Sequence, residues 1–150
     1  MNIKNKYTVK SIKRYETYEW FKKKHYAKRI PNIIYCFGLY NINKTLQGVL
    51  SYGSPPSNSL VTGAFNGKYT DIFLELNRLC INDNLEKNSL SFFVSQSLKL
   101  LPKPKVIVSY ADTSQNHHGY IYQACNFIYT GLSDKRREWR MRGNNKHSKT

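Results

Sequence analysis

The segment of this sequence that is best suited to catalysis is SYAD at 109–112, which directly follows an apolar run. It closes a predicted strand at 105–112 with a hydroxyl, a phenol and a carboxylate. Because a carboxylate is costly to bury in the apolar centre of a sheet, we expect Asp112 at the end of the strand, beside a ligand cleft. At that position Asp112 could act as a general base or orient another catalytic group, and it could equally cap the helix that follows.

Histidines supply the second set of candidate groups. His25 and Tyr26 follow a run of lysines and combine an acid–base group with an aromatic platform. His25, Asp112 and one of His117 and His118 could also converge as a site with two histidines and one carboxylate, a pattern typical of a metal such as iron. The alternative is that these side chains serve packing and capping alone.

Several common sites are missing from the sequence. It contains no GxSxG, HExxH or GxxxxGK[ST] motif, so the hydrolases, zinc proteases and P-loop enzymes that carry them are not indicated. Cys36, Cys80 and Cys125 lie far apart without a CxxC pair, which disfavours a disulfide scaffold and a zinc site built from cysteines. We expect three reduced thiols, mostly buried.

Charge is concentrated at the two ends of the chain. The 150 residues carry a net charge of +15, of which residues 1–30 hold +8 and residues 133–150 hold +5, while 31–132 hold only +2. Two basic flanks around a nearly neutral centre favour a polyanionic partner, with nucleic acid first. An anionic membrane is disfavoured because neither flank has an apolar stripe, and no apolar run approaches the ~18 residues of a membrane span. We therefore expect a cytoplasmic protein without a signal peptide.

The basic flanks contain the side chains that we expect to contact phosphates. The last predicted strand, at 135–142, alternates arginines with Trp139 and Met141, so that one side can face a nucleic-acid backbone. Beyond about 143 the polar tail is expected to be flexible. The predicted phosphate contacts are Lys22, Lys23, Lys24, Lys28, Arg29, Arg136, Arg140 and Arg142.

Periodicity and turn residues predict the elements that must position these groups. In order they are a strand at 7–12, a helix at 15–28, a hairpin of strands at 33–40 and 46–53, a loop at 54–70 with room for a short helix, a strand at 71–81, a helix ending at 101, a strand at 105–112, a helix at 115–126, and strands at 127–132 and 135–142. Asp83 followed by Glu86 is a capping-box signal for the helix that ends at 101.

This order predicts one α/β (α+β) domain over 1–150, a mixed sheet flanked by helices, and it resembles the GCN5-related N-acetyltransferase (GNAT) fold. In that fold the strands before and after the central helix splay apart to form a cleft, which here would separate 71–81 from 105–112. Acyl-CoA enzymes of the fold carry a glycine-rich turn at the start of that helix. This chain has NDNLEKNS at 82–89 instead, without glycine and with two acids, which disfavours binding of a pyrophosphate by backbone amides.

Five motifs, in the right order between about 20 and 132, resemble the phage Mom DNA-modification proteins. They are HYAKRIP (25–31), GVLSYGSPPS (48–57), ELNRL (75–79), KNSLS (87–91) and SYADTSQNHHGYIYQACNFIYTG (109–131). The resemblance implies an acyltransferase-like fold that places a carbamoylmethyl group on the 6-amino nitrogen of adenine in phage DNA, which protects that DNA from host restriction. The motif positions imply site residues His25, Tyr26, Ser109, Asp112, Tyr122 and Arg78.

Such a reaction makes demands that these residues could meet. The lone pair of the adenine amine is delocalised into the ring, so a base must take its proton and donors must stabilise the charge that develops. The adenine of double-stranded DNA must also be flipped out of the stack and held against aromatic side chains. The resemblance leaves the donor open between an acyl-CoA and a glycyl-tRNA, which would make tRNA a further partner, and it leaves iron possible.

Two other functions fit the same sequence. A non-catalytic nucleic-acid-binding module would use the basic flanks alone, with the SYAD segment purely structural. An N-acetyltransferase acting on another amine would share the fold, but the absent glycine turn and the cationic flanks disfavour it. Mass spectrometry of DNA nucleosides distinguishes the first alternative from a DNA-modifying enzyme.

Overall fold

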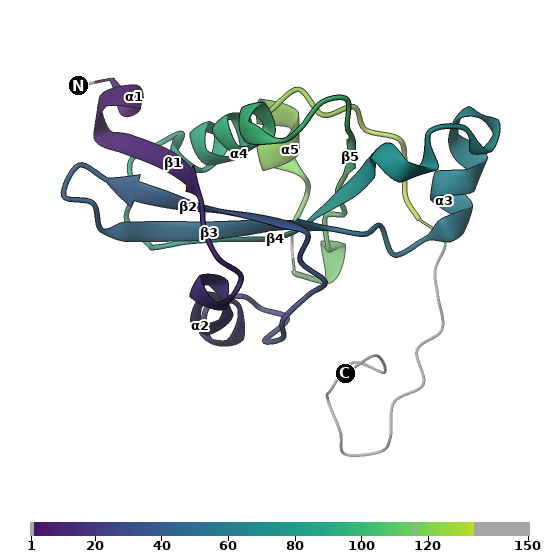
Figure 1. Ribbon diagram of the computed structural model, residues 1–150. Helices are drawn as coiled ribbons and strands as arrows, with labels where there is room; N and C mark the ends of the chain where they lie inside the picture. Colours follow the sequence, from purple (N-terminus) through teal and green to yellow (C-terminus); the bar gives the residue numbers. More distant parts are fainter. Residues whose placement is uncertain (1, 116, 134–150) are drawn as a thin grey trace, which may run out of the picture.

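A curled sheet of five strands forms the centre of the protein in a computed structural model, which describes residues 2–115 and 117–133 (Figure 1). The strands are β1 (Tyr7–Ser11), β2 (Tyr35–Asn41), β3 (Leu46–Gly53), β4 (Phe73–Ile81) and β5 (Val106–Val108). They lie in the order β1-β2-β3-β4-β5; the first four are antiparallel to their neighbours and β5 runs parallel to β4. This is the mixed sheet that the sequence predicts.

Helices cover both faces of the sheet. They are α1 (Ile3–Lys6), α2 (Tyr15–Lys23), α3 (Asn58–Gly63), α4 (Ser89–Leu100) and α5 (Tyr120–Ala124). Figure 1 shows α4 and α5 on one face and α2 on the other, while α3 lies at the far end of β3 and β4. Within the described residues, no helix has the length and apolar character needed to cross a membrane.

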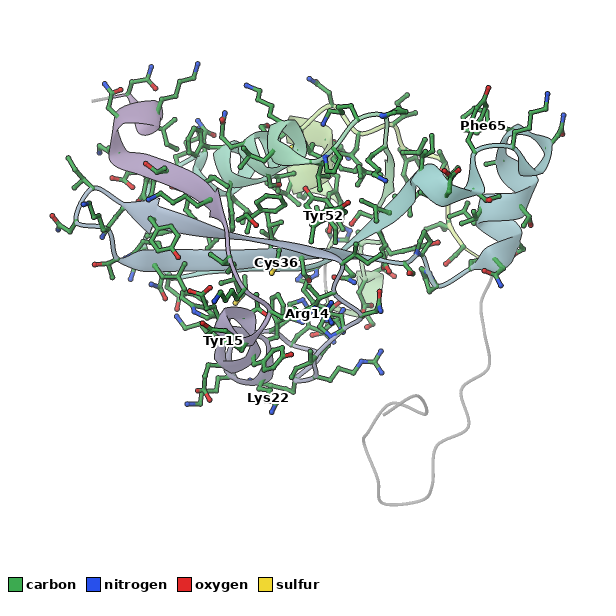
Figure 2. The ribbon with its side chains drawn as sticks, viewed as in Figure 1. Arg14, Tyr15, Lys22, Cys36, Tyr52 and Phe65 are labelled. Atoms are coloured by element: carbon green, nitrogen blue, oxygen red, sulfur yellow. The ribbon has the colours of Figure 1, made fainter. Side chains whose placement is uncertain are left out.

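Two hydrophobic clusters hold these layers together. The α4-side core joins Phe93 and Val94 of α4 to Leu50 and Tyr52 of the sheet, and all four side chains are fully buried. The α2-side core is smaller and centres on Phe21 of α2. Cys36 of β2, which belongs to this core, lies between the sheet and α2 in Figure 2. Close packing on both faces makes the sheet a rigid support for the segments at its edge.

The hairpin, the long loop and the central helix follow the prediction closely. The hairpin strands β2 and β3 lie within two residues of the expected bounds, and the loop after β3 contains the short helix α3. Cys36, Cys80 and Cys125 are free thiols, as expected, and burial raises the pKa of each. Helix α1 is an element that the sequence did not predict.

The first predicted helix is five residues too long. Helix α2 ends at Lys23, and His25 and Tyr26 lie in the turn that follows it. The backbone N–H of Ala27 donates to Nδ1 of His25, and Lys28 has a left-handed φ of 51°. Because this side-chain bond replaces a helical backbone bond, the chain leaves the helix well before Pro31.

The segment after α4 contains less regular structure than the sequence predicts. Strand β5 has three residues instead of eight, and α5 has five because Gly119, with a φ of 74°, stands directly before it. Residues 127–132 form no strand, and Ile128 and Tyr129 are exposed there. The predicted strand at 135–142 and the tail beyond it lie outside the described residues.

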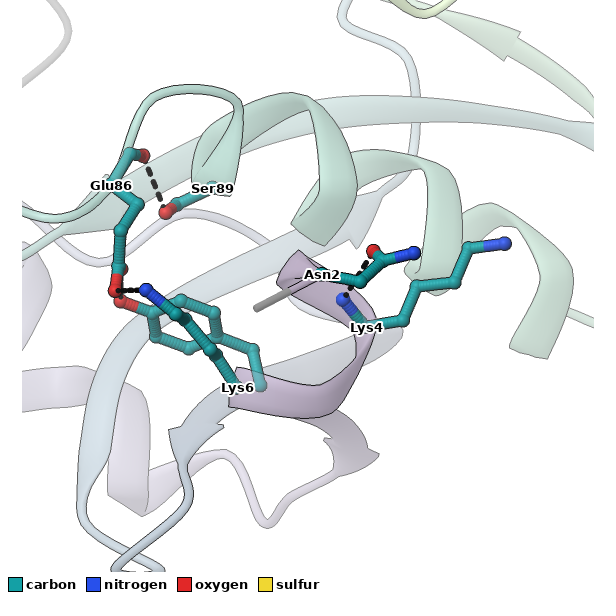
Figure 3. Close-up of polar contacts among 6 residues, drawn as sticks. Asn2, Lys4, Lys6, Glu86 and Ser89 are labelled. Atoms are coloured by element: carbon teal, nitrogen blue, oxygen red, sulfur yellow. Dashed lines mark hydrogen bonds and ion pairs between the residues drawn. The ribbon is translucent and has the colours of Figure 1, made fainter.

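The predicted capping box at Asp83 and Glu86 is wrong. The residue before α4 is Asn88, in a left-handed conformation and without a side-chain cap. Glu86 instead accepts hydrogen bonds from Lys6, at 2.8 Å, and from the hydroxyl of Tyr7, so it ties α4 to the N-terminal segment (Figure 3). These bonds hold the pKa of Glu86 at about 2.

Candidate active site at the divergence of β4 and β5

Strands β4 and β5 separate soon after they begin to pair. Their parallel register covers Phe73–Glu75 of β4 and Val106–Val108 of β5, and β4 then continues for six residues without β5 while it remains paired with β3. At the point of separation, the hydroxyl of Ser109 donates to the backbone oxygen of Leu76 over 2.9 Å. Ser109 therefore marks the apex of the splay that the sequence predicts, and its hydroxyl helps to hold the two strands there.

A β-bulge in β4 decides which side chains face α2. The register against β3 shifts so that Asn77 is an extra residue between Leu76 and Arg78. Leu76 and Leu79 both pack into the α4-side core, although an uninterrupted strand would place residues three apart on opposite faces. Glu75 and Arg78 accordingly both face the α2 side, where His25 and Tyr26 lie.

The bulged residue also fastens the segment that follows α2. The Asn77 side chain donates to the backbone oxygen of Asn32 over 2.7 Å and accepts from Ser51 over 2.6 Å. Gly53 permits this approach, because a Cβ added there would lie 2.1 Å from the same Asn32 oxygen. The chain between α2 and β2, which carries His25 and Tyr26, is thereby held against the sheet.

His25 is a buried, neutral imidazole. Burial, together with the charges of Arg78 and His117, lowers its pKa to about 4. Since Nδ1 accepts the N–H of Ala27 over 3.1 Å, the proton of the neutral ring resides on Nε2. In this state Nε2 is a hydrogen-bond donor and not a base.

Tyr26 lies between two imidazole rings. Its ring is 4.4 Å from that of His25, centre to centre, and meets that of His117 edge to face at 5.4 Å. Burial raises the pKa of the Tyr26 phenol, and Asp112 raises it further while Arg78 opposes both. The phenol therefore stays protonated at neutral pH and can donate a hydrogen bond, and the rings form an aromatic surface.

Asp112 performs the capping role that the sequence allowed. Its Oδ1 accepts from the backbone N–H of Ser114 at 3.0 Å and from the Ser114 hydroxyl at 2.6 Å. The turn Thr113–Gln115 begins directly after it. These bonds orient the half-buried carboxylate, whose charge acts on Tyr26, so the cap and a chemical role are compatible.

Tyr122 of α5 and Glu75 of β4 are two further ionisable groups of the site. Burial raises the pKa of Tyr122, a hydrogen bond with Ser109 opposes this, and the charge of Glu75 raises it again. Burial also raises the pKa of Glu75, and Arg78 opposes that change. The structure thus brings His25, Tyr26, Arg78, Ser109, Asp112 and Tyr122 to one edge of the sheet, as the sequence implied.

Glu75 and Asn77 are two residues of this site that the sequence analysis missed. An uninterrupted period of two puts Glu75 and Arg78 on opposite faces, and a bulge has no firm sequence signature. The sequence feature that could have indicated them is a carboxylate and an arginine inside a mostly apolar strand. Burying either charge there costs desolvation free energy, so such residues are expected where a binding or catalytic site uses them.

The expected metal ligands are not gathered. Among the described residues, no group of three or more histidine, cysteine, aspartate or glutamate side chains is placed to hold a metal ion. The Nδ1 atom of His25 is occupied by Ala27, and the ring of His118 faces Tyr120 at 6.0 Å. The residues present therefore do not fit a metal, and we derive no step through one.

The start of α4 also does not fit the pyrophosphate of an acyl-CoA. The N–H of Ser89 is already bonded to the Glu86 oxygen, and the Ser89 hydroxyl donates to the same atom over 2.6 Å. The ionised carboxylate of Glu86 lies at this end of the helix (Figure 3). A helix N-terminus that carries its own anion is a poor anion site.

The lysines predicted to contact phosphates around α2 are all exposed. Lys23 pairs with Glu19 at 2.5 Å, and Lys28 donates to the backbone oxygen of Lys23. Lys24 lies over the ring of Trp20 at 4.7 Å and donates to Asn82. The predicted contacts Arg136, Arg140 and Arg142 lie outside the described residues.

Solved structures share this fold. An acetyltransferase of Deinococcus radiodurans R1 superposes with a TM-score of 0.53 at 9% identity, covering 91% of this chain and 92% of its own. A GNAT family acetyltransferase of Streptococcus pneumoniae TIGR4 gives 0.51 at 11% identity, covering 88% and 99%. The architecture is that of the GNAT acetyltransferases.

The sequence relatives narrow this class. A family model described as the Mom protein family matches residues 6–150, so this chain belongs to the Mom protein family. It is 32% identical over 116 residues to a protein of Escherichia phage Mu named methylcarbamoylase mom. That match covers 72% of this chain and 46% of the relative, so the chain spans about half the length of the phage protein.

Proposed function

We propose that this protein is a transferase that modifies the 6-amino nitrogen of adenine in double-stranded DNA with a carbamoylmethyl group. The observation that carries the proposal is the clustering of Tyr26, Arg78, Ser109, Asp112 and Tyr122 where β4 and β5 diverge. Membership of the Mom family and the methylcarbamoylase name of the phage Mu relative support it. In a phage-infected cell, the modified DNA would resist restriction.

The residues of the site have separate roles in binding the adenine, taking its proton and stabilising charge. An extruded adenine stacks against the rings of Tyr26 and His117, which replace the neighbours that it loses in the duplex. Asp112, oriented by Ser114, takes the proton from the adenine amine as that nitrogen attacks the ester carbonyl of the glycyl donor. The ester C–O bond then breaks, and the tRNA leaves with its hydroxyl. The neutral Nε2–H of His25 and the phenol of Tyr26 are donors for the negative charge that develops on the acceptor group.

The contacts at the start of α4 bear on which molecule donates the carbamoylmethyl group. An acyl-CoA and a glycyl-tRNA both remain donors that the sequence indicates, and the occupied helix terminus at Glu86 and Ser89 argues against the former. A glycyl unit has the two carbons and the nitrogen of the transferred group. Direct acyl transfer gives the isomeric aminoacetyl group, so the carbamoylmethyl product requires a subsequent rearrangement in which the two nitrogens exchange carbons. We therefore favour the glycyl-tRNA, which also suits a basic protein.

Mass spectrometry of nucleosides tests the function. DNA from cells that express the protein should contain a modified adenosine with the added mass of a carbamoylmethyl group. Cells that express Tyr26→Phe, which keeps the aromatic surface and loses the phenol donor, should contain at least tenfold less. Unmodified adenine in cells that contain the folded protein would show that it binds nucleic acid without modifying it.

A further inference from the structure

The loop between β3 and β4 carries an exposed aromatic tip at residues 65–69. Phe65 is 60% exposed and Tyr69 is 61% exposed, although both side chains are large and aromatic. Their rings meet edge to face with the centres 6.2 Å apart, so the angle between them is defined while much of each ring lies in solvent. The ring of Phe65 also contacts that of Phe73, the first residue of β4, at 6.3 Å between centres. The aromatic tip is therefore anchored to the start of a strand.

The backbone of the aromatic tip adopts conformations that its residues disfavour. Phe65, Asn66 and Tyr69 have left-handed φ angles of 51°, 55° and 61°. Such angles are uncommon for aromatic residues, and residues held in them concentrate at sites that bind ligands. Glycine at either aromatic position would relieve the strain and remove an exposed ring. Folding alone therefore does not account for the two aromatic side chains.

The side chains beside the rings indicate a nucleic acid and not a protein partner. Asn66, Lys68 and Thr70 are all exposed, and Lys68 forms no ion pair with any residue that the structure describes. A protein interface needs a continuous apolar core, which these polar neighbours interrupt. Unpaired bases instead stack singly on aromatic rings, while amides bond to their edges and lysines bind their phosphates. The aromatic tip thus has the composition of a surface for single-stranded nucleic acid.

The orientation of the aromatic tip separates it from the surface proposed for DNA. Figure 2 shows Phe65 projecting on the side of the sheet that carries α4, whereas α2, with Lys22, lies on the other side. An intact DNA duplex also offers no unpaired bases, but the 3′ end of a tRNA does, and its last nucleotide carries the aminoacyl ester. From the aromatic tip, β4 leads directly to the cleft, because Phe73 pairs with Val106 and the two strands separate after Glu75.

We propose that the aromatic tip binds the unpaired 3′ nucleotides of the donor tRNA by stacking them on Phe65 and Tyr69. This inference rests on the proposed function in taking a glycyl-tRNA as the donor. Phe73 and Glu75 are two residues apart, or ~7 Å along the strand, so a 3′ end stacked here lies near the cleft where the ester must react. The two nucleic acids then occupy different sides of the protein, the DNA beside α2 and the tRNA end at the aromatic tip.

A binding experiment without glycine or DNA tests the site. The probe is a fluorescent RNA hairpin with the acceptor-stem sequence of a glycine tRNA and its unpaired 3′ end, and a second hairpin lacks that end. Fluorescence anisotropy gives the Kd of each hairpin for the wild-type protein, Phe65→Ala, Tyr69→Ala and Tyr69→Phe. Tyr15→Ala is the matched control, because Tyr15 is 63% exposed and lies on α2 (Figure 2).

The wild-type protein should bind the hairpin with the unpaired end about tenfold more tightly than the blunt hairpin, the gain expected from a stacked base. Phe65→Ala and Tyr69→Ala should lose this preference and bind the blunt hairpin as the wild type does. Tyr69→Phe, which keeps the ring, and Tyr15→Ala should retain the preference. Far-UV circular dichroism confirms that each variant is folded.

Other outcomes would overturn the inference and separate it from the proposed function. Equal affinity of the wild-type protein for the two hairpins, or a full preference in either alanine variant, would exclude the site. Tighter binding of a DNA hairpin with the same unpaired end would assign the aromatic tip to the substrate strand and overturn the inference as well. Modified adenosine in cellular DNA together with any of these results would leave the function intact. A preference for the unpaired RNA end with unmodified cellular adenine would overturn the function and retain the site.

Discussion

At the residue scale, Asp112 accepts two hydrogen bonds at one carboxylate oxygen, and these separate its structural role from its proposed chemistry. The bonds come from Ser114 and need only an acceptor, which an asparagine oxygen also supplies. Proton abstraction needs a basic carboxylate, which asparagine lacks. One substitution therefore preserves the cap and removes the base.

We expect Asp112→Asn to abolish adenine modification while the free energy of unfolding changes by at most about 1 kcal/mol. The control Ser114→Ala removes a cap bond and keeps the carboxylate, so it should cost about 1 kcal/mol and leave most of the activity. Nucleoside mass spectrometry and urea denaturation measure the two effects. Undiminished modification by Asp112→Asn would show that Asp112 is a cap only.

His25 predicts a pH dependence of stability. Its pKa is about 4 in the folded protein and 6.5 ordinarily, so protons favour the unfolded chain. The contribution is fully present above pH 6.5 and is lost as the pH falls towards 4, a loss of about 3 kcal/mol. Urea denaturation between pH 7 and pH 4 should show this loss in the wild type and not in His25→Gln. Parallel curves for the two proteins would place His25 in solvent.

At the scale of elements, the site depends on a short loop that lies directly on a strand. The chain after α2 approaches β3 so closely that the backbone oxygen of Asn32 occupies the place of a side chain at Gly53. Asn77, the extra residue of the bulge, donates to that same oxygen. The position of His25 and Tyr26 therefore depends on strand geometry and on one side-chain amide, as well as on the end of helix α2, where the N–H of His25 donates to the Trp20 oxygen.

Gly53→Ala should disrupt this contact. A Cβ would lie 2.1 Å from the oxygen of Asn32, so the loop must move and we expect a loss of about 2–4 kcal/mol together with most of the activity. Gly63→Ala is the matched control, because no atom lies within 4 Å of its Cβ position; it should be neutral or stabilising by up to about 1 kcal/mol. Thermal denaturation compares them. Equal melting temperatures would mean that the loop is not held at Gly53.

At the scale of the whole molecule, the sheet separates two faces, one covered by α2 and the other by α4. Helix α2 and the segment after it form the side with the candidate site and exposed lysines, while α4 covers the other face (Figure 1). If DNA lies across the α2 side, charge there should matter and equal charge on the α4 side should not. A polyanion bound only through net charge would treat both sides alike.

The double variant Lys22→Gln/Lys28→Gln should weaken DNA binding irrespective of sequence. Each lost phosphate contact should flatten the plot of log K against log salt by about 0.9. Lys87→Gln/Lys99→Gln, which removes two exposed lysines at the two ends of α4, is the control and should leave the slope unchanged. Equal slopes for all three proteins would place the DNA elsewhere on the molecule.

The sequence alone determined the order of most elements and the class of fold, and it indicated most of the residues that we propose for the site. Alternating and helical periodicities are local, so β1 to β4 and α4 could be predicted from them, and the SYAD and His–Tyr segments carry their chemistry in their residue types. The tertiary structure decided the rest. Where β5 ends, that 127–132 form no strand, and that Glu86 bonds to Lys6 all depend on partners distant in the chain. The bulge at Asn77 turns Glu75 and Arg78 to one face because pairing with β3, and not the period of the strand, sets the register.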